Sequence, residues 1–323
     1  MPTNTAGVSG TYTDVNSWVA LRAQAVDPFA AKEIVAVTSG GITTTATQDI
    51  SGFDENGQGW ELKADTGASF REHASAAANP QFYDSTKGAF IEKTSGQPAV
   101  IDASVTNGTI KDLQVKKDDD GYNEVIHISN SGNTVNLENL ISHLATGSRN
   151  IVQRKGNITD VLAVCDEGDG MLISSGGGTL NRVNVRRLNG PGGTGITQDY
   201  GTWSGTNVVV SGFSTDMTGT MTGSHCATDQ AAGGLPSTNR QVSLVAATEW
   251  ESATADFRVA SGSAKLKDNG TGVAPDIIGQ AQSGAATDIG QWEFQAGGGG
   301  GARPCLVDGR LVNDGLLLKG LAA

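Results

Sequence analysis

Ile110-Lys-Asp-Leu113, Leu137-Glu-Asn-Leu140, Ile158-Thr-Asp-Val161 and Leu180-Asn-Arg-Val183 share one pattern, in which an apolar residue, any residue, a polar residue and an apolar residue follow one another. A degraded fifth copy stands at Val209-Val-Ser-Gly212. With the polar residue as the marker, successive copies lie 27, 21, 22 and 29 residues apart. A repeat of this length indicates a solenoid in which each copy belongs to one coil.

A second apolar patch follows each of the four clear copies, 11 to 14 residues after the marker, and turn-forming stretches separate the two. Two or three short alternating strands per repeat are typical of a parallel β-helix coil. We therefore predict an all-β fold, a single-stranded right-handed parallel β-helix whose inward Ile, Leu and Val side chains stack about 4.8 Å apart. A β-sandwich or an antiparallel barrel is the alternative, although its turns are expected about every 8 to 12 residues and without this motif.

The N-terminal stretch differs from the repeats. Asp14 is placed to cap a short helix in which Val15, Trp18, Val19 and Arg22 fall at helical spacing. The open end of a solenoid exposes apolar side chains and unpaired strand edges, so a covering element is required there. We expect residues 1–40 to hold this capping helix and the first strands, and 41–296 to form the β-helix body.

The C-terminal end carries a run of five glycines at 297–301, which is a flexible linker by composition. Residues 302–323 follow it and are too rich in Leu and Val to stay exposed, so we expect them to form a docking tail that packs on its own body or on another chain. The predicted docking residues are Leu306, Val307, Leu311, Val312, Leu316, Leu317, Leu318 and Leu321.

Composition narrows the classes of partner. The 323 residues include 45 Gly, and 34 acidic against 22 basic side chains give a net charge of −12. Binding to nucleic acid requires clustered Lys and Arg, so a nucleic-acid partner is not expected. The chain has no long apolar stretch and no basic, apolar leader, so we expect neither a membrane partner nor a secretion signal. The three widely spaced cysteines, Cys165, Cys226 and Cys305, are expected to be buried thiols.

Two regions resemble a known family. Residues 255–264, 274–279 and 287–294 resemble the closing segment of right-handed parallel β-helix proteins of the pectate-lyase-like kind. Here Lys265-Leu266 replaces the usual apolar-Asp pair, and Gln280 stands near where an Arg is common. Residues 10–18 and 64–71 are similar to N-terminal segments of phage-encoded and environmental β-helix proteins. The resemblance implies the fold strongly and the function weakly, because lyases, hydrolases, tailspikes and inert virion proteins all share this fold.

Two acidic turns are candidates for a catalytic or Ca²⁺ site if the solenoid cleaves polysaccharides, because carboxylates from neighbouring coils can converge on one face. Acidic residues that solvate loop tips are the plainer interpretation, under which we assign no catalytic residue, no metal ligand and no cofactor. The histidines sit in no recognisable catalytic motif. The candidates are Asp118, Asp119 and Asp120 in the first turn, Asp166, Glu167 and Asp169 in the second, and Arg186 as a nearby cation.

The function that we expect is that of a non-catalytic structural protein of a tailed-phage virion, as a capsid decoration, a head spike or a tail-fibre component. Its partners would be other virion proteins, reached through residues 302–323, with further copies of the chain and a host-surface glycan as additional candidates. The alternative is a polysaccharide lyase or glycoside hydrolase of the β-helix type. A self-assembling bacterial surface protein is a third interpretation.

Overall fold

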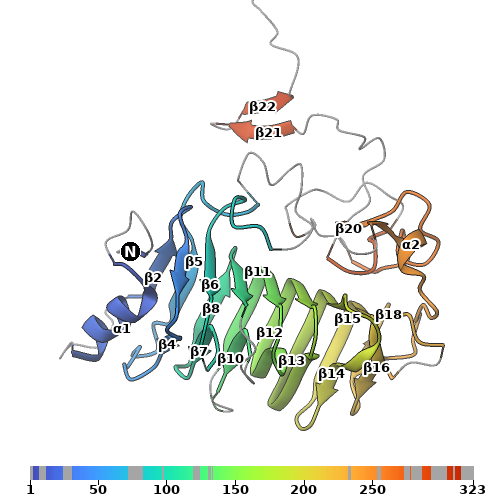
Figure 1. Cartoon of the computed structure of the whole chain (residues 1–323), viewed down its shortest axis with the longest axis horizontal. Helices are drawn as coiled ribbons and strands as arrows, with labels where there is room; N and C mark the ends of the chain where they lie inside the picture. Colours follow the sequence, from blue (N-terminus) through green and yellow to red (C-terminus); the bar gives the residue numbers. More distant parts are fainter. Residues whose placement is uncertain are drawn as a thin grey trace, which may run out of the picture.

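The computed structural model describes residues 3–6, 12–24, 31–71, 83–96, 98–118, 124–129, 132, 134–231, 234–252, 256–272, 277, 286–291, 304–307 and 310–313. Its body is a parallel β-solenoid, in which short strands stack coil upon coil from the N-terminal end (Figure 1). Every pairing in its large sheet is parallel, and each pairing joins residues of two successive coils. The predicted parallel β-helix is therefore confirmed.

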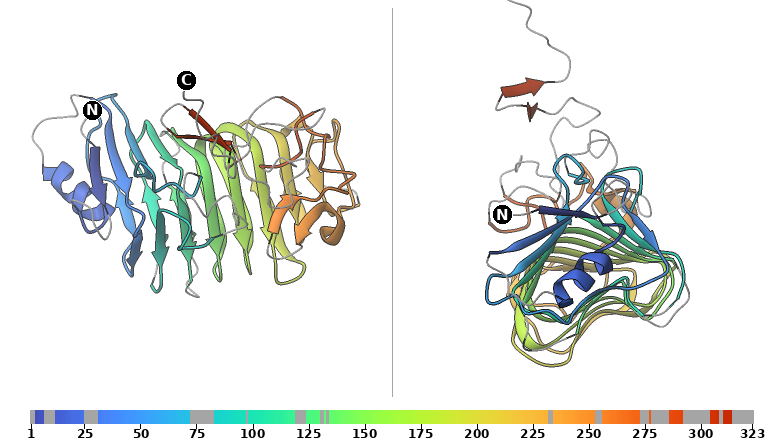
Figure 2. Two further views of the ribbon diagram at one scale, coloured as in Figure 1. Left: turned by 90° about the horizontal axis from the view of Figure 1, so that it is seen from above. Right: turned by 90° about the vertical axis from the view of Figure 1, so that its left-hand side faces the viewer.

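Three faces form the solenoid, which has a roughly triangular outline when viewed from its N-terminal end (Figure 2). Face A contains β1 (Thr3–Ala6), β2 (Glu33–Val37), β5 (Trp60–Ala64), β8 (Gly108–Lys111), parts of β11 (Val135–Leu144), β12 (Arg149–Cys165), β13 (Asp169–Arg187) and β15 (Trp203–Ser211), and β17 (Thr222–Ser224). Face B contains β3 (Ile42–Thr44), β6 (Phe90–Lys93), β9 (Gln114–Lys117), the last parts of β11, β12, β13 and β15, and β18 (Ala227–Thr228). Face C contains β4 (Gln48–Ile50), β7 (Ile101–Ala103), β10 (Ile126–Ile128), the first parts of β12 and β13, β14 (Gly192–Gln198) and β16 (Phe213–Thr218).

The core is built from columns of side chains in the same register. On face A, Leu62, Ile110, Leu137, Ile158 and Leu180 occupy one column, and all five are buried. On face C the second apolar patches of the repeats form a column of their own, which contains Ile126, Ile151, Met171 and Ile196. Ile101 of the preceding coil extends this column. Burying one such side chain stabilises the fold by about 1.5–3 kcal/mol, so the columns supply most of its hydrophobic stabilisation.

The polar marker of the repeat marks the corner between faces A and B. Asp112, Asn139, Asp160 and Arg182 all have left-handed backbone conformations, with φ between 50° and 57°. Few residues other than glycine adopt this region, and Asn and Asp are enriched in it. The polar residue therefore recurs because the chain must turn sharply at the same point of every coil.

The fifth copy of the repeat was assigned wrongly. Leu180 pairs with Gly205 and Val183 with Val208, so the corner residue of that coil is Asn207, with φ 56°. Ser211 lies on face B instead, opposite Arg186. Glycine replaces the expected apolar residue because Met221 fills the space: a Cβ on Gly205 would lie 2.6 Å from the Met221 methyl carbon.

The N-terminal helix α1 (Val15–Gln24) lies over the open end of the solenoid (Figure 2). Val15, Trp18 and Val19 are buried in the core, as their spacing predicts. Asp14 caps the helix, because its Oδ1 accepts a hydrogen bond of 2.8 Å from the Ser17 backbone N–H. Arg22 pairs with Glu33 at 2.8 Å and so joins the predicted cap to the second strand.

The segment after the last coil covers the outside of face B. The parallel pairing ends at β18 and at the bridge between Ala227 and Gln241. Helix α2 (Ala246–Glu249) and the antiparallel strands β19 (Trp250–Ser252) and β20 (Asp256–Val259) follow. We call residues 244–252, 256–272 and 286–291 the fold-back segment. Although we expected these residues within the β-helix body, they form no further coil.

A second hydrophobic cluster holds the fold-back segment in place. Ile141, Leu162 and Val164 alternate with the inward residues of face B and therefore point outward, yet all are buried. They share this cluster with Trp250 and Phe257 of the fold-back segment. Where the fold-back segment covers it, face B is therefore apolar on both sides, which is unusual for a solenoid wall open to water.

At the C-terminal end, β21 (Pro304–Val307) and β22 (Arg310–Asn313) form a separate antiparallel pair. Four of the predicted docking residues, Leu306, Val307, Leu311 and Val312, belong to these strands. The glycine linker 297–301 and Leu316, Leu317, Leu318 and Leu321 lie outside the described residues.

Candidate functional site

The outer surface of face A carries two rows of polar side chains. One row contains Thr109, Asn136, Asn157, Thr179, Ser204 and Thr222, and the other contains Lys111, Glu138, Thr159, Asn181, Thr206 and Ser224. They alternate with the inward column, as residues of a half-buried strand must. Threonine, serine and asparagine dominate these rows, so the face presents both hydrogen-bond donors and acceptors to solvent.

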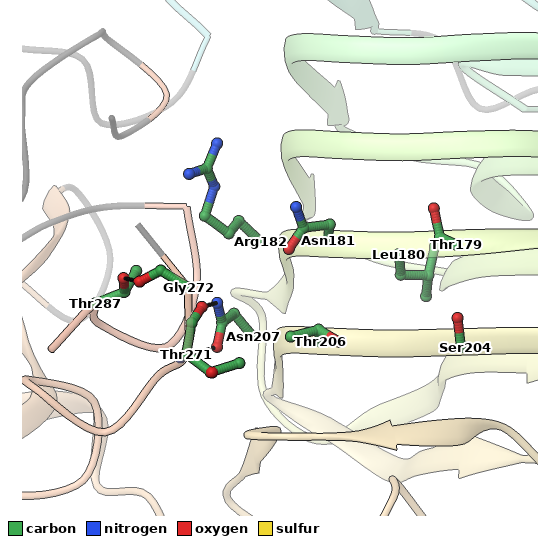
Figure 3. A pocket seen from close by; sticks show the side chains of 10 residues that line it. All are labelled: Thr179, Leu180, Asn181, Arg182, Ser204, Thr206, Asn207, Thr271, Gly272 and Thr287. Carbon is green, nitrogen blue, oxygen red and sulfur yellow. Dashed lines mark hydrogen bonds between the residues drawn. The ribbon is translucent and has the colours of Figure 1, made fainter. Parts of the chain in front are cut away.

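A pocket of about 430 Å³ opens where this polar surface meets the fold-back segment (Figure 3). Strand β13 forms one part of its wall, β15 the next, and the fold-back segment the third. The described residues that line it are Thr179, Leu180, Asn181, Arg182, Ser204, Thr206, Asn207, Thr271, Gly272 and Thr287.

A buried ion pair lies at the edge of this pocket. Arg182 Nε donates a hydrogen bond of 2.6 Å to Asp160 Oδ1, and Arg182 Nη2 donates to Asp160 Oδ2, so the pair is bidentate. Only 7% and 8% of the two side chains are exposed. Burial raises the pKa of Asp160 despite the hydrogen bonds and charge of Arg182. The remaining nitrogen, Arg182 Nη1, is buried and makes no hydrogen bond within the described structure.

The opposite edge of the pocket is fixed by Asn207, which is buried at the corner of its coil. Its Nδ2 donates to the Thr271 carbonyl at 2.8 Å, and its Oδ1 accepts from the Thr271 N–H at 2.9 Å. Its own carbonyl accepts from the Gly290 N–H at 3.1 Å. Figure 3 shows Asn207 facing Thr271 across the pocket edge. The pocket is therefore preformed by the same contacts that attach the fold-back segment.

The predicted acidic turns lie elsewhere, at the end of face B. Asp118 and Asp166 occupy equivalent positions two coils apart, since their N–H groups donate to the carbonyls of Lys93 and Leu144, the last residues of β6 and β11. Glu167 is exposed, and Asp169 Oδ1 accepts a hydrogen bond of 2.8 Å from the Thr194 N–H. Asp119 and Asp120 lie outside the described residues.

Two basic side chains, Lys116 and His143, lie between Asp118 and Asp166. Neither was among the candidates predicted from the sequence. Lys116 Nζ lies 2.7 Å from Asp118 Oδ1 and 3.4 Å from Glu92 Oε1, and His143 Nε2 lies 3.2 Å from Asp166 Oδ1. Glu92, Lys116 and His143 are consecutive in one outward column of face B. We call Glu92, Lys116, Asp118, His143 and Asp166 the charged cluster. The sequence indicates only that these side chains alternate with inward apolar residues along each strand. That alternation does not show which residues become neighbours across coils.

Two ionisable groups of the charged cluster, Lys116 and Asp118, have pKa values shifted away from neutrality. Burial lowers the pKa of Lys116, but hydrogen bonds and charges from Asp118 and Glu92 outweigh it and raise the pKa overall. Burial also raises the pKa of Asp118, but hydrogen bonds from Lys116 and Glu92 and the charges of Lys116 and His143 lower it overall. Burial raises the pKa of Tyr83, whose ring lies 5.2 Å from Lys116 Nζ. Lys116 is therefore held as an ammonium and Asp118 as a carboxylate at neutral pH.

Arg186, the predicted cation, does not join the charged cluster. Its guanidinium lies 3.9 Å from the centre of the Trp250 ring and 4.5 Å from that of Phe257. Burial lowers its pKa to about 9, against the opposing charge of Asp229. It lines a second pocket, of about 420 Å³, beside Asp229 and Trp250. Stacking between two aromatic rings attaches the fold-back segment to face B, which is a structural role.

No group of three or more His, Cys, Asp or Glu side chains that could hold a metal ion occurs within the described part of the chain. Within these residues, the acidic turns do not gather the carboxylates that the polysaccharide-cleaving alternative would need for a Ca²⁺ site. Cys165 and Cys226 are buried free thiols, and burial raises the pKa of each to about 12. Over the same residues, no helix has the length and apolar character that crossing a membrane requires.

No protein-family model and no curated protein matches this chain. Among solved structures, the chain is similar to a crystal structure of the pectate lyase Pel9A, with 13% sequence identity and a TM-score of 0.48. The alignment covers 91% of this chain and 98% of that chain. The parallel pairing of this chain's own strands establishes its β-solenoid fold.

Proposed function

We propose that this chain is a non-catalytic structural solenoid that displays face A toward a surface, as a capsid decoration, head spike or tail-fibre component of a tailed-phage virion. The observation that carries the non-catalytic part is the charged cluster. Its carboxylates are bound to Lys116 and His143, and they line neither of the two pockets described above.

The protonation states support the same conclusion. A general base works best when its pKa lies near the working pH. The pKa of Lys116 is raised and that of Asp118 is lowered, so each group is moved away from the range in which it exchanges protons readily. Perturbed groups at catalytic centres are usually shifted toward neutrality, which is the opposite direction.

Sequence alone supports the virion part of the proposal. Residues 10–18 and 64–71 are similar to N-terminal segments of phage-encoded β-helix proteins, and the apolar tail 302–323 requires a surface to cover it. Capsid or tail proteins would supply that surface, and the net charge of −12 favours partner patches that are basic.

Deleting residues 302–323 tests the anchoring role. Particles would be purified from a strain that produces the truncated chain, and the chain would be quantified in them beside the intact one. We expect incorporation to be lost while the far-ultraviolet circular dichroism of the isolated body is unchanged. Undiminished incorporation would contradict anchoring through this tail.

A polysaccharide lyase or hydrolase is the second candidate function, and the adjacency of two basic side chains, Lys116 and His143, in one outward column of face B is the observation that favours it. In β-elimination a base removes the proton next to a uronate carboxyl, the bond to the leaving oxygen breaks, and that oxygen takes a proton. Lys116 and His143 lie between carboxylates on one face, which is an arrangement that such chemistry can use. Substituting Lys116 and His143 by Ala separates the two candidates, because only an enzyme would lose cleavage.

A further inference from the structure

We propose that the pocket between β13, β15 and the fold-back segment binds an uncharged saccharide. This inference deepens the proposed function, since it supplies the chemical class of the partner that face A would meet. It assigns a ligand to residues outside both acidic turns.

The pocket is rigid enough to select a ligand. Two of its walls are strands held on both sides by neighbouring coils, and the third is attached by the pair between Asn207 and Thr271. Side chains presented by strands are positioned more accurately than those on free loops. Its volume of about 430 Å³ is within the range of small-ligand sites.

The polar groups of the pocket match a polyhydroxylated ligand. Asn181, Ser204 and Thr206 are partly exposed and stand on adjacent coils, about 4.8 Å apart along the stack. An amide and two hydroxyls can each donate and accept hydrogen bonds. Sugar hydroxyls also do both, so one ring can bond to several of these side chains at once.

Arg182 forms a fixed part of the pocket wall. Its bidentate pair with Asp160 fixes the guanidinium plane and neutralises its charge. Its remaining nitrogen, Nη1, is closed off from solvent, so it does not reach into the pocket. On this side the pocket therefore presents a neutralised wall to a ligand.

The local charge favours an uncharged ligand over an acidic one. Asp160 already neutralises Arg182, and the carboxylate of Glu138 is close enough to act on Asp160. Arg71 also acts on Asp160, but it is itself paired with Asp112 at 3.4 Å. A uronate would therefore add a fourth carboxylate to three that share two guanidinium groups. The chain as a whole is acidic as well, with a net charge of −12.

The test is binding of the full chain to an array of neutral hexose and N-acetylhexosamine oligosaccharides, with oligogalacturonate as the acidic probe, followed by titration of any neutral oligosaccharide that binds. We expect Asn181→Ala, which removes the amide that lines the pocket, to weaken binding about 3- to 10-fold. Thr206→Ala is expected to weaken it by a similar factor. Thr159→Ala is the matched control, since Thr159 lies in the same outward row and outside the pocket, and it should leave the affinity unchanged.

The outcomes separate this inference from the proposed function. Neutral-saccharide binding that is insensitive to Asn181→Ala and Thr206→Ala would overturn the assignment to this pocket and leave the structural role standing. Preference for oligogalacturonate would overturn the ligand class, and so would failure to bind any oligosaccharide on the array. The structural role is decided separately, by incorporation into particles and by the absence of cleavage.

Discussion

Asn207 and Thr271, which are 64 residues apart in the sequence, form a reciprocal pair in which the Asn207 amide both donates to and accepts from the Thr271 backbone, at 2.8 and 2.9 Å. The pair connects a corner of the solenoid to the fold-back segment. The Asn207 amide is hydrogen-bonded to the Thr271 backbone instead of to water, and the two residues form one edge of the saccharide pocket.

Asn207→Gly should therefore loosen the fold-back segment. Glycine keeps the left-handed backbone at φ 56° but loses both side-chain hydrogen bonds. We expect the free energy of unfolding to fall by about 1–3 kcal/mol and proteolysis to begin within the fold-back segment. Asn139→Gly is the matched control: Asn139 has φ 50° at an equivalent corner, and its side chain makes no hydrogen bond in the described structure. Equal losses from the two variants would show that the pair contributes nothing of its own.

Gly178→Ala should disrupt the stacking of β12 on β13. A Cβ at this position would lie 1.8 Å from the Gly156 carbonyl oxygen and 2.9 Å from the Trp203 ring. We expect a loss of about 1–3 kcal/mol in chemical denaturation, because a backbone atom cannot move aside cheaply. Gly262→Ala, whose Cβ meets nothing within 4 Å, should change stability by less than about 0.5 kcal/mol. If Gly178→Ala proved as harmless as this control, the coil spacing described for this region would be wrong.

Glu61→Gln should reveal a pH-dependent contribution to stability. Glu61 lies within 2.7 Å of Lys32 Nζ, 3.4 Å of Lys111 Nζ and 3.7 Å of Lys63 Nζ. Burial raises its pKa, but the hydrogen bonds and charges of Lys32 and Lys111 outweigh burial and lower it below the ordinary 4.5. A carboxyl with a lowered folded pKa stabilises the fold above its ordinary pKa and loses that contribution as pH falls through the folded value.

The free energy of unfolding of wild type should therefore exceed that of Glu61→Gln by about 1–3 kcal/mol at pH 7. The difference should shrink as the pH is lowered below about 4.5, which urea denaturation at a series of pH values measures. A difference that stays constant from neutral to acid pH would contradict the lysine contacts as its source.

Trp250→Ala should detach the fold-back segment from face B. Trp250 is buried in the second hydrophobic cluster, and its ring lies 3.9 Å from the Arg186 guanidinium carbon. We expect a loss of about 3–5 kcal/mol from the missing ring, and hydrogen exchange should accelerate in β19 and β20 while β12 stays protected. Exchange that accelerates equally in β12 would show that the segment and the solenoid unfold as one unit.

Much of the solenoid could be predicted from sequence, because the side-chain alternation and the corner conformations that determine it are local and recur in each coil. The inward columns follow from alternation, and the corner residues follow from the preference of Asn and Asp for left-handed backbone. The capping helix was predicted from Asp14 and the spacing of Val15, Trp18 and Val19. The coil at Gly205 was missed because the side chain that fills its place, Met221, comes from the next coil.

The position of the fold-back segment was the larger error, and one signal for it was present. Val161-Leu-Ala-Val-Cys165 is an unbroken apolar run, which indicates a strand buried on both faces rather than on one. The candidate sites were harder to predict, because the partners of Lys116, Asp166 and Arg182 include residues from other coils. Their pairing depends on register across coils of unequal length, which the repeat spacing alone does not fix.

The most direct test of the non-catalytic account is a cleavage assay on the full chain. Neutral and uronate-containing polysaccharides would be incubated with wild type and with the Lys116→Ala and His143→Ala variants, and new reducing ends and unsaturated products would be counted over time. We predict no product above the protein-free background for any of the three proteins. Product formation by wild type that either substitution abolishes would contradict the account and identify the charged cluster as an active site.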